Sequence, residues 1–231
     1  MSIAAVRFDD NLITHEQSRL MLSIKSIVEM QVDCVARWHH ETVDNPFASA
    51  GEISSIFAIA CQQHQFNYLL WHEEDIARSR DVSDAKIAKV KRNIDRYNQA
   101  RNDWIEKIDD WITADLEEQK IQSDAGARLN TETPGSAVDR LSIMSLRVYH
   151  LDEQLERNDV DKQHTDKVNM RLSICRLQQQ DLAHALEELL ADIYAGTKRH
   201  RTYRQMKMYN DPTLNPFLYG KLQTKISPSD E

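Results

Sequence analysis

The stretch SDAKIAKVKRNIDRYNQARNDWIEKIDDWITADLEE, residues 83–118, decides the fold. Its apolar residues recur at alternating steps of three and four, at Ile87, Val90, Ile94, Tyr97, Trp104, Ile108 and Trp111. This spacing lines one face of a helix with apolar side chains, which is typical of a helix that packs on a core. Ser83 can cap the first turn through its hydroxyl group. We therefore predict one long amphipathic helix from Ser83 to Glu118.

The same periodicity predicts further helices on both sides of this one. We expect a first helix over about residues 15–42 with Thr14 as its cap, and a second over about residues 52–79. A fourth helix would begin at Pro134, because proline suits a first helical turn, with Thr133 as its cap. A fifth would follow a turn at residues 156–166 and end near Gly196, a natural C-terminal stop.

These elements predict an all-α protein, an antiparallel bundle of about five long helices with a basic C-terminal arm. The expected division is an N-terminal segment at 1–14, a helical bundle domain at 15–197, and an arm with a flexible end at 198–231. Only 5 Gly and 5 Pro occur in 231 residues. A β-rich fold would need more of these turn-forming residues, so the composition also favours helices.

Charge and cysteine content narrow the expected class of protein. A net charge of −8 disfavours a general nucleic-acid binder, because phosphate backbones attract a basic surface. The 3 cysteines are scattered and lack metal-ligand spacing, which suits a reduced compartment. The first residues carry acids where a signal peptide needs an apolar run, and no stretch approaches the roughly 20 apolar residues of a membrane span. We therefore expect a cytoplasmic protein without a membrane span.

A polar stripe runs along the second predicted helix and continues on the third. Side chains with polar groups that are costly to bury follow the three-four spacing there. They are His64, Asn67, Trp71, Glu74, Asp75 and Arg78, then Lys91, Asp95, Asn98, Arg101 and Asn102. Arg101 falls where the core stripe expects a hydrophobe, and burying it requires a carboxylate or an anionic ligand. Because the break between the two helices is short, we predict that they form one shared polar site. The alternative is a solvated face with spaced ion pairs.

The residue types of the stripe suggest several kinds of chemistry. His64 and His72 are candidate acid-base groups, although either histidine alone is more often structural. Glu74 and Asp75 could move a proton or hold Mg²⁺ through oxygen ligands, together with Glu106 and Asp109. The remaining candidates would bind an anionic ligand: Arg78, Lys91, Arg92 and Arg101 through charge, and Trp71 by stacking on a base or sugar ring.

Two further segments are candidates for binding. Around the predicted start of the fourth helix, Glu132 precedes free backbone NH groups that attract anions, and Asp139, Arg140, Arg147 and His150 follow. Helix capping and an Asp139–Arg140 pair would explain part of this segment without a ligand. The C-terminal stretch KRHRTYRQMKMY, 198–209, alternates basic and large side chains. It would pack back over the acidic bundle or dock a partner or an anion.

Three segments together resemble one family. NYLLWHEEDIAR (67–78), KRNIDRYNQARNDWIEKID (91–109) and LNTETPGSAVDRLSIMSLRVYH (129–150) are similar to the hallmark stretches of the bacterial domain of unknown function 4254 family. The resemblance implies a cytosolic bacterial protein, often encoded beside glycosyltransferases of lipopolysaccharide, and it assigns no catalytic roles. The recurrent family positions correspond to Trp71, His72, Glu74, Asp75, Arg78, Lys91, Arg92, Asp95, Asn98, Arg101, Asn102, Asp103, Glu132, Pro134, Gly135, Asp139 and Arg140.

Three functional hypotheses follow. The first is a helical enzyme or binding protein for an anionic, phosphorylated sugar or nucleotide in surface-glycan assembly. The second is a noncatalytic partner of a glycosyltransferase that docks through the C-terminal arm. The third is a metal-dependent nucleotide pyrophosphohydrolase-like enzyme. A homo-oligomer is compatible with each hypothesis.

Overall fold

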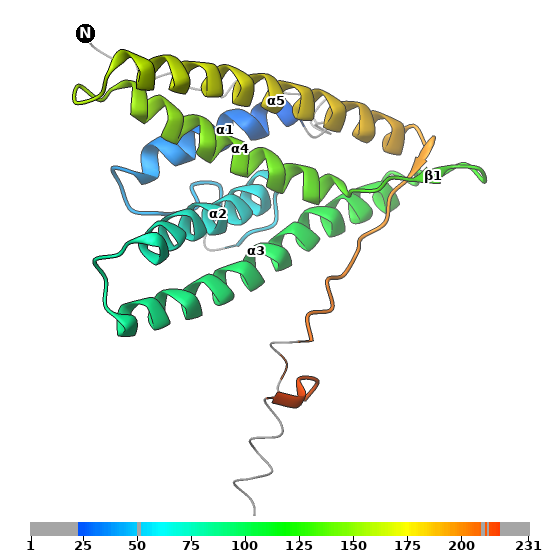
Figure 1. Cartoon of the computed structure of the whole chain (residues 1–231). Coiled ribbons are helices and arrows are strands. Elements are labelled where there is room, and N and C mark those ends of the chain that lie inside the picture. The colour runs from blue at the N-terminus through cyan, green and yellow to red at the C-terminus, as the bar shows by residue number, and fades with distance from the viewer. Residues whose placement is uncertain (1–22, 50–51, 209–210, 212, 218–231) are drawn as a thin grey trace, which may run out of the picture.

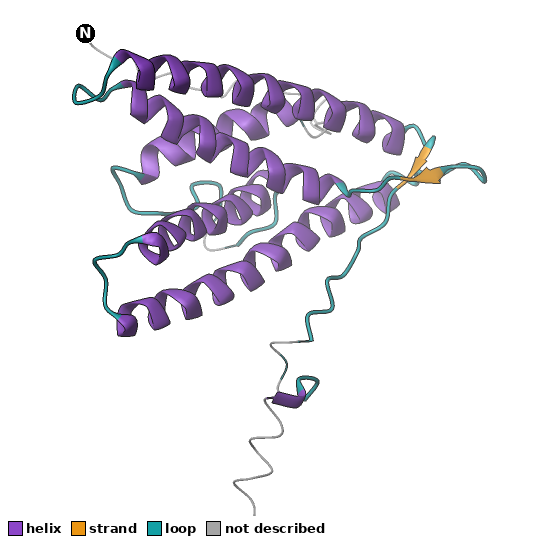
Figure 2. Cartoon of the chain, in the orientation of Figure 1, coloured by secondary structure: helices purple, strands orange, loops and turns teal. Residues whose placement is uncertain are grey.

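The computed structural model describes residues 23–49, 52–208, 211 and 213–217, and five long helices dominate them (Figures 1 and 2). The elements in chain order are α1 (Ile24–Trp38), α2 (Ile56–Arg78), α3 (Asp84–Glu118), β1 (Arg128–Leu129), α4 (Pro134–Leu155), α5 (Lys162–Tyr194) and β2 (Lys198–Arg199). The prediction of an all-α bundle is confirmed. None of the described helices combines the length and apolarity needed to cross a membrane.

Local capping signals set several helix ends where the sequence predicted them. The Ser83 hydroxyl accepts from the backbone N–H of Lys86 at the start of α3. The Thr133 hydroxyl accepts from Ser136 N–H at the start of α4, one residue before Pro134. Gly196, at φ +77°, follows the end of α5 and accommodates the left-handed conformation that ends many helices.

Other helix boundaries differ from the prediction. α1 begins at Ile24 with Ser23 as its cap and ends at Trp38, so it stops before Thr42. The predicted cap Thr14 and residues 15–22 lie outside the described residues. α2 begins at Ile56 because Ser55 caps it, somewhat later than expected. α5 begins at Lys162, capped by Asp161, inside the stretch 156–166 that was predicted to be a turn.

One hydrophobic core lies between all five helices. Its fully buried members include Ile27 on α1, Ile108 and Ile112 on α3, Leu141 on α4 and Leu186 on α5. A smaller cluster joins Leu70 on α2 to Val90 and Ile94 on α3, at the end where these two helices are connected. Burial of these side chains is the main stabilising contribution to the fold.

The polar break after α3 contains a two-residue strand. β1 pairs in parallel with β2, in the register Arg128 with Lys198 and Leu129 with Arg199. The pairing fixes the start of the C-terminal arm beside the end of α3, as Figure 1 shows. From there the arm follows α3. Arg204 contacts Glu106 and Asp110, and the backbone N–H of Gln205 donates to Glu106. The arm therefore packs against the acidic bundle.

Candidate functional site

A chain of buried and half-buried polar side chains crosses the core. We call it the buried polar chain, and its members come from every helix: Gln31 on α1, Gln63, His64 and Asn67 on α2, Arg101 on α3, Asp139, Ser142 and Ser145 on α4, and Gln179 on α5. Four of these residues, His64, Asn67, Arg101 and Asp139, were predicted site residues. The structure brings these four residues together in one polar chain.

Asp139 is the acceptor at one end of the buried polar chain. Its Oδ1 atom accepts from Gln63 Nε2 at 2.6 Å and from Asn67 Nδ2 at 2.9 Å. Arg101 Nε lies 3.9 Å from the same oxygen, and it has no hydrogen-bond partner among the residues that the structure describes. Burial raises the pKa of Asp139, while Arg101 and the Asn67 bond oppose the rise. The carboxylate that Arg101 requires is therefore provided by α4.

His64 is fully buried and both of its ring nitrogens have protein partners. Nε2 lies 2.9 Å from the carbonyl oxygen of Gln31, which can only accept, so Nε2 carries the proton. Nδ1 then accepts from the Ser142 hydroxyl at 2.6 Å. Burial lowers the pKa of His64 to about 3. The ring is therefore neutral near pH 7, and its hydrogen bonds are fully used within the protein.

The charged part of the predicted stripe lies at the surface as ion pairs. Arg78 contacts Glu74 at 3.0 Å and Asp75 at 3.6 Å, and Lys91 pairs with Asp95. This part of the stripe corresponds to the solvated face that was the alternative interpretation.

Other predicted binding residues lie at the surface or beneath the C-terminal arm. Arg140 pairs with Glu132 at 2.7 Å, and Arg92 is exposed. The arm reaches Asn98 and Asn102, whose oxygens accept from Lys207 and Gln205. Most of the predicted anion-binding cations therefore have a carboxylate partner of their own.

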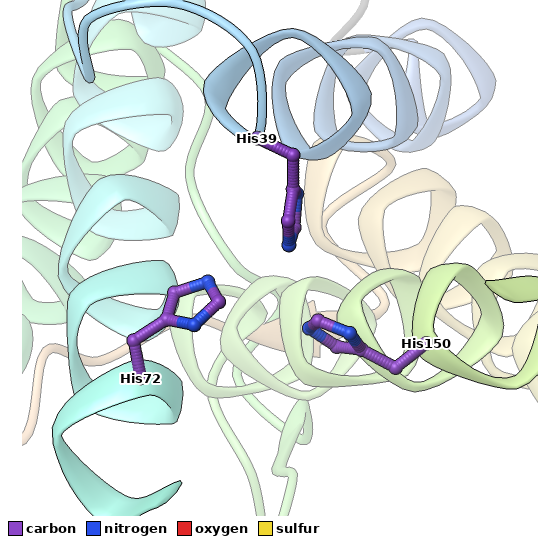
Figure 3. Close-up of side chains that lie close together, drawn as sticks. All are labelled: His39, His72 and His150. Carbon is purple, nitrogen blue, oxygen red and sulfur yellow. The ribbon is translucent and has the colours of Figure 1, made fainter. Parts of the chain in front are cut away.

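Three histidines from three helices form a second cluster, the histidine cluster (Figure 3). His39 follows the last residue of α1, His72 lies on α2 and His150 lies on α4. One ring nitrogen of each lies within 4.8 Å of the others. In Figure 3 the three rings point toward one common space. A tetrahedral zinc site has nitrogen ligands about 2.0–2.1 Å from the ion. Movements of about an ångström in each ring would therefore bring the three nitrogens within bonding distance of one ion.

Hydrogen bonds orient two of the rings for metal binding. His39 Nδ1 donates to the carbonyl oxygen of Val35 at 2.7 Å, and His150 Nδ1 lies 2.6 Å from a Glu153 carboxylate oxygen. Such bonds fix the tautomer that leaves Nε2 with a free lone pair, as in most metal-binding histidines. The Nε2 atoms of all three rings are buried and have no hydrogen-bond partner in the described part of the chain.

Aromatic side chains hold the histidine cluster in place. Trp71 stacks on His150 with ring centres 4.8 Å apart and planes 10° apart. Tyr149 stacks on His39 at 4.3 Å, and the ring edge contact between Tyr68 and His72 is 4.5 Å. The Trp71 indole, predicted to stack on a ligand ring, therefore stacks on a histidine of this cluster.

The surroundings of His72 favour its neutral form. Burial lowers the pKa of His72, and the neighbouring His39 and His150 lower it further, while Asp75 and Glu153 act in the opposite direction. The neutral imidazole is the form that binds metals.

The sequence prediction found one member of the histidine cluster as a catalytic candidate, His72. It noted His150 on a polar face of the fourth helix without assigning it to a site, and it missed His39. A usable signal was present in RWHHET, residues 37–42, where two adjacent histidines end an apolar helix. The distances that join the three residues depend on how the helices pack.

Comparison with known proteins places the chain in a family. A family model described as "Protein of unknown function (DUF4254)" matches residues 58–202. The chain belongs to this family. No curated protein and no solved structure gave a match. The DUF4254 segment contains His72, His150 and most of the buried polar chain, whereas His39 and Gln31 precede it.

Proposed function

We propose that this DUF4254 protein binds a first-row transition metal ion through His39, His72 and His150 and uses the ion to hold an anionic ligand. The observation that carries the proposal is the presence of three buried, unpartnered Nε2 atoms in one cluster, within the described residues. A buried polar atom without a partner is costly, and a ligand at this position would satisfy all three.

The ligand atoms favour zinc or a similar ion over Mg²⁺. Imidazole nitrogens suit Zn²⁺, Cu²⁺, Ni²⁺ and Fe²⁺, whereas Mg²⁺ prefers oxygen ligands. The acids predicted to hold Mg²⁺ have other partners in the fold: Glu74 and Asp75 contact Arg78, and Glu106 contacts Arg204. The histidine cluster is therefore the better candidate for an ion.

Three protein ligands leave a coordination position open. In sites of this type a bound water becomes acidic enough to act as a nucleophile near neutral pH, or an anionic oxygen of a ligand binds directly. The positive charge of the ion would also attract an anionic ligand to this site. From the family resemblance we take the ligand to be a phosphorylated sugar or nucleotide of surface-glycan assembly in the cytoplasm.

The metal site is tested by titrating metal-free protein with Zn²⁺ in a calorimeter and with Co²⁺ by visible absorption. We expect one ion per chain, and a Co²⁺ spectrum typical of nitrogen ligands. His72→Ala should weaken binding at least about tenfold, because second-sphere changes alone already cost 10–100-fold. His40→Ala is the matched control, since His40 is exposed and adjacent in sequence to His39. Equal binding by both variants would remove the proposal.

The chemical role is tested with the metal-loaded protein. Nucleotide sugars and nucleoside triphosphates are incubated with the Zn²⁺ form and the metal-free form, and release of phosphate or pyrophosphate is measured. Turnover by the metal form alone would indicate a metal-dependent hydrolase, which includes the pyrophosphohydrolase hypothesis. Ligand binding without turnover would indicate a binding protein.

The C-terminal arm favours a second candidate function, docking onto a glycosyltransferase. Arg204 anchors the arm to α3, while Tyr203, Met206 and Met208 on the same segment are exposed. Exposed aromatic and methionine side chains are enriched in protein interfaces. Co-purification of a glycosyltransferase with the full chain, and its loss after Met206→Asp with Met208→Asp, would support this function.

A further inference from the structure

A second apolar stripe lies on the outer face of α5. Met170, Ile174 and Leu177 follow the three-four spacing of one helix face, and their exposed fractions are 58%, 47% and 57%. The residues of α5 that are buried in the core, such as Val168 and Leu186, lie on the opposite face. Figure 1 shows α5 along one edge of the bundle, and its packing partners there are α4, α1 and β2.

The charges of α5 are distributed unevenly along its length. The first half carries four Lys or Arg residues and one acid. The second half carries four acids and no Lys or Arg. The basic residues are Lys162, Lys167, Arg171 and Arg176, and the acids of the second half are Asp181, Glu187, Glu188 and Asp192. Two such helices side by side in the same direction would repel each other at both ends. Two helices in opposite directions would attract at both ends.

We infer that the outer face of α5 binds the same face of a second copy of this chain, with the two helices in opposite directions. The apolar stripe and the charges agree on one register. In an antiparallel pair, the residue numbers of facing positions add up to nearly the same value, which is 347 for Met170 with Leu177 and 348 for Lys167 with Asp181. Ile174 then lies near the symmetry axis and faces its own counterpart. This interface is isologous, so it closes at a dimer.

The exposed positions of Lys167 and Asp181 make the register testable. Both residues are exposed on the face that carries the apolar stripe. Lys167→Asp should weaken the dimer, because two acids would face each other on each side of the axis. Asp181→Lys should weaken it in the same way. The protein with both changes should regain the dimer, since each pair again has opposite signs.

The experiment is sedimentation velocity of the full chain over a wide range of concentration. We expect a monomer–dimer equilibrium that Ile174→Asp weakens at least about tenfold, since like charges would meet near the axis. Met206→Asp is the control, because Met206 is an exposed methionine on the arm, away from α5. Circular dichroism checks that each variant keeps its helix content.

Three results would overturn the inference. The first is a monomer at every concentration. The second is a dimer that Ile174→Asp leaves unchanged, because the interface would then lie elsewhere. The third is failure of the double charge exchange to restore a dimer that each single exchange weakens, because the direction or register would then be different.

Discussion

His64 makes the stability of the fold depend on pH in a predictable direction. Its pKa is about 3 in the folded protein, because the ring is fully buried, and about 6.5 in the unfolded chain. As the pH falls below 6.5, the unfolded chain takes up a proton that the folded protein does not. The contribution of His64 to the free energy of unfolding is therefore complete above pH 6.5 and is lost progressively as the pH falls toward 3.

The size of this loss follows from the two pKa values. Between pH 7 and pH 5 the unfolded state gains roughly 2 kcal/mol relative to the folded state through this one histidine. Asp139 acts with the opposite sign, since its pKa is raised by burial and its folded form takes up a proton more readily. Asp139 is present in both proteins compared below, so its contribution largely cancels.

The measurement compares wild type with His64→Gln by urea unfolding at pH 7, 6 and 5, at fixed protein concentration and with a chelator present. Gln can still donate and accept hydrogen bonds, but it does not titrate. We expect the variant to be less stable at pH 7 and to lose roughly 2 kcal/mol less than wild type on going to pH 5. His184→Gln, at an exposed position, should follow wild type. Parallel stability curves for wild type and His64→Gln would refute this account of His64.

Two further predictions concern contacts that hold α3. Gly135→Ala should lower the free energy of unfolding by about 1–3 kcal/mol, because the added Cβ would lie 2.5 Å from the backbone oxygen of Ile105. Gly126→Ala is the control in the same urea assay, since a Cβ at Gly126 would have no atom within 4 Å. Arg204→Ala should change the free energy of unfolding by less than about 1 kcal/mol, because the ion pairs of Arg204 with α3 acids such as Asp110 are exposed. The same change should speed cleavage of the arm in limited proteolysis. Unchanged cleavage would mean that other contacts hold the arm.

Signals that act over a few residues allowed much of the fold to be predicted. Thr133 and Pro134 mark a helix start, and Gly196 marks a stop, because each acts through its own backbone or a hydrogen bond three residues away. The start of α1 could not be placed in this way. The apolar residues of the predicted helix begin at Leu20, ahead of Ser23, and Ser23 gives no stronger capping signal than Thr14.

The candidate site was predicted only in part, because it is assembled by tertiary packing. Arg101 could be placed inward, since it interrupts an apolar seam. Gln31 and Ser145 gave no such signal, because uncharged polar residues are common on both faces of a helix. The histidine cluster joins positions 39, 72 and 150, and no spacing within one helix brings them together. Their proximity depends on how α1, α2 and α4 pack.

The buried polar chain has a consequence for how the molecule unfolds. Four of the five helices are joined through hydrogen bonds within it, from Gln31 on α1 to Gln179 on α5, and α3 joins through the ion pair between Arg101 and Asp139. Detaching any single helix would leave donors or acceptors on the others stranded in an apolar interior, where water does not replace them without further opening. Partly unfolded intermediates are therefore penalised, and the bundle should lose its structure in one cooperative step rather than helix by helix.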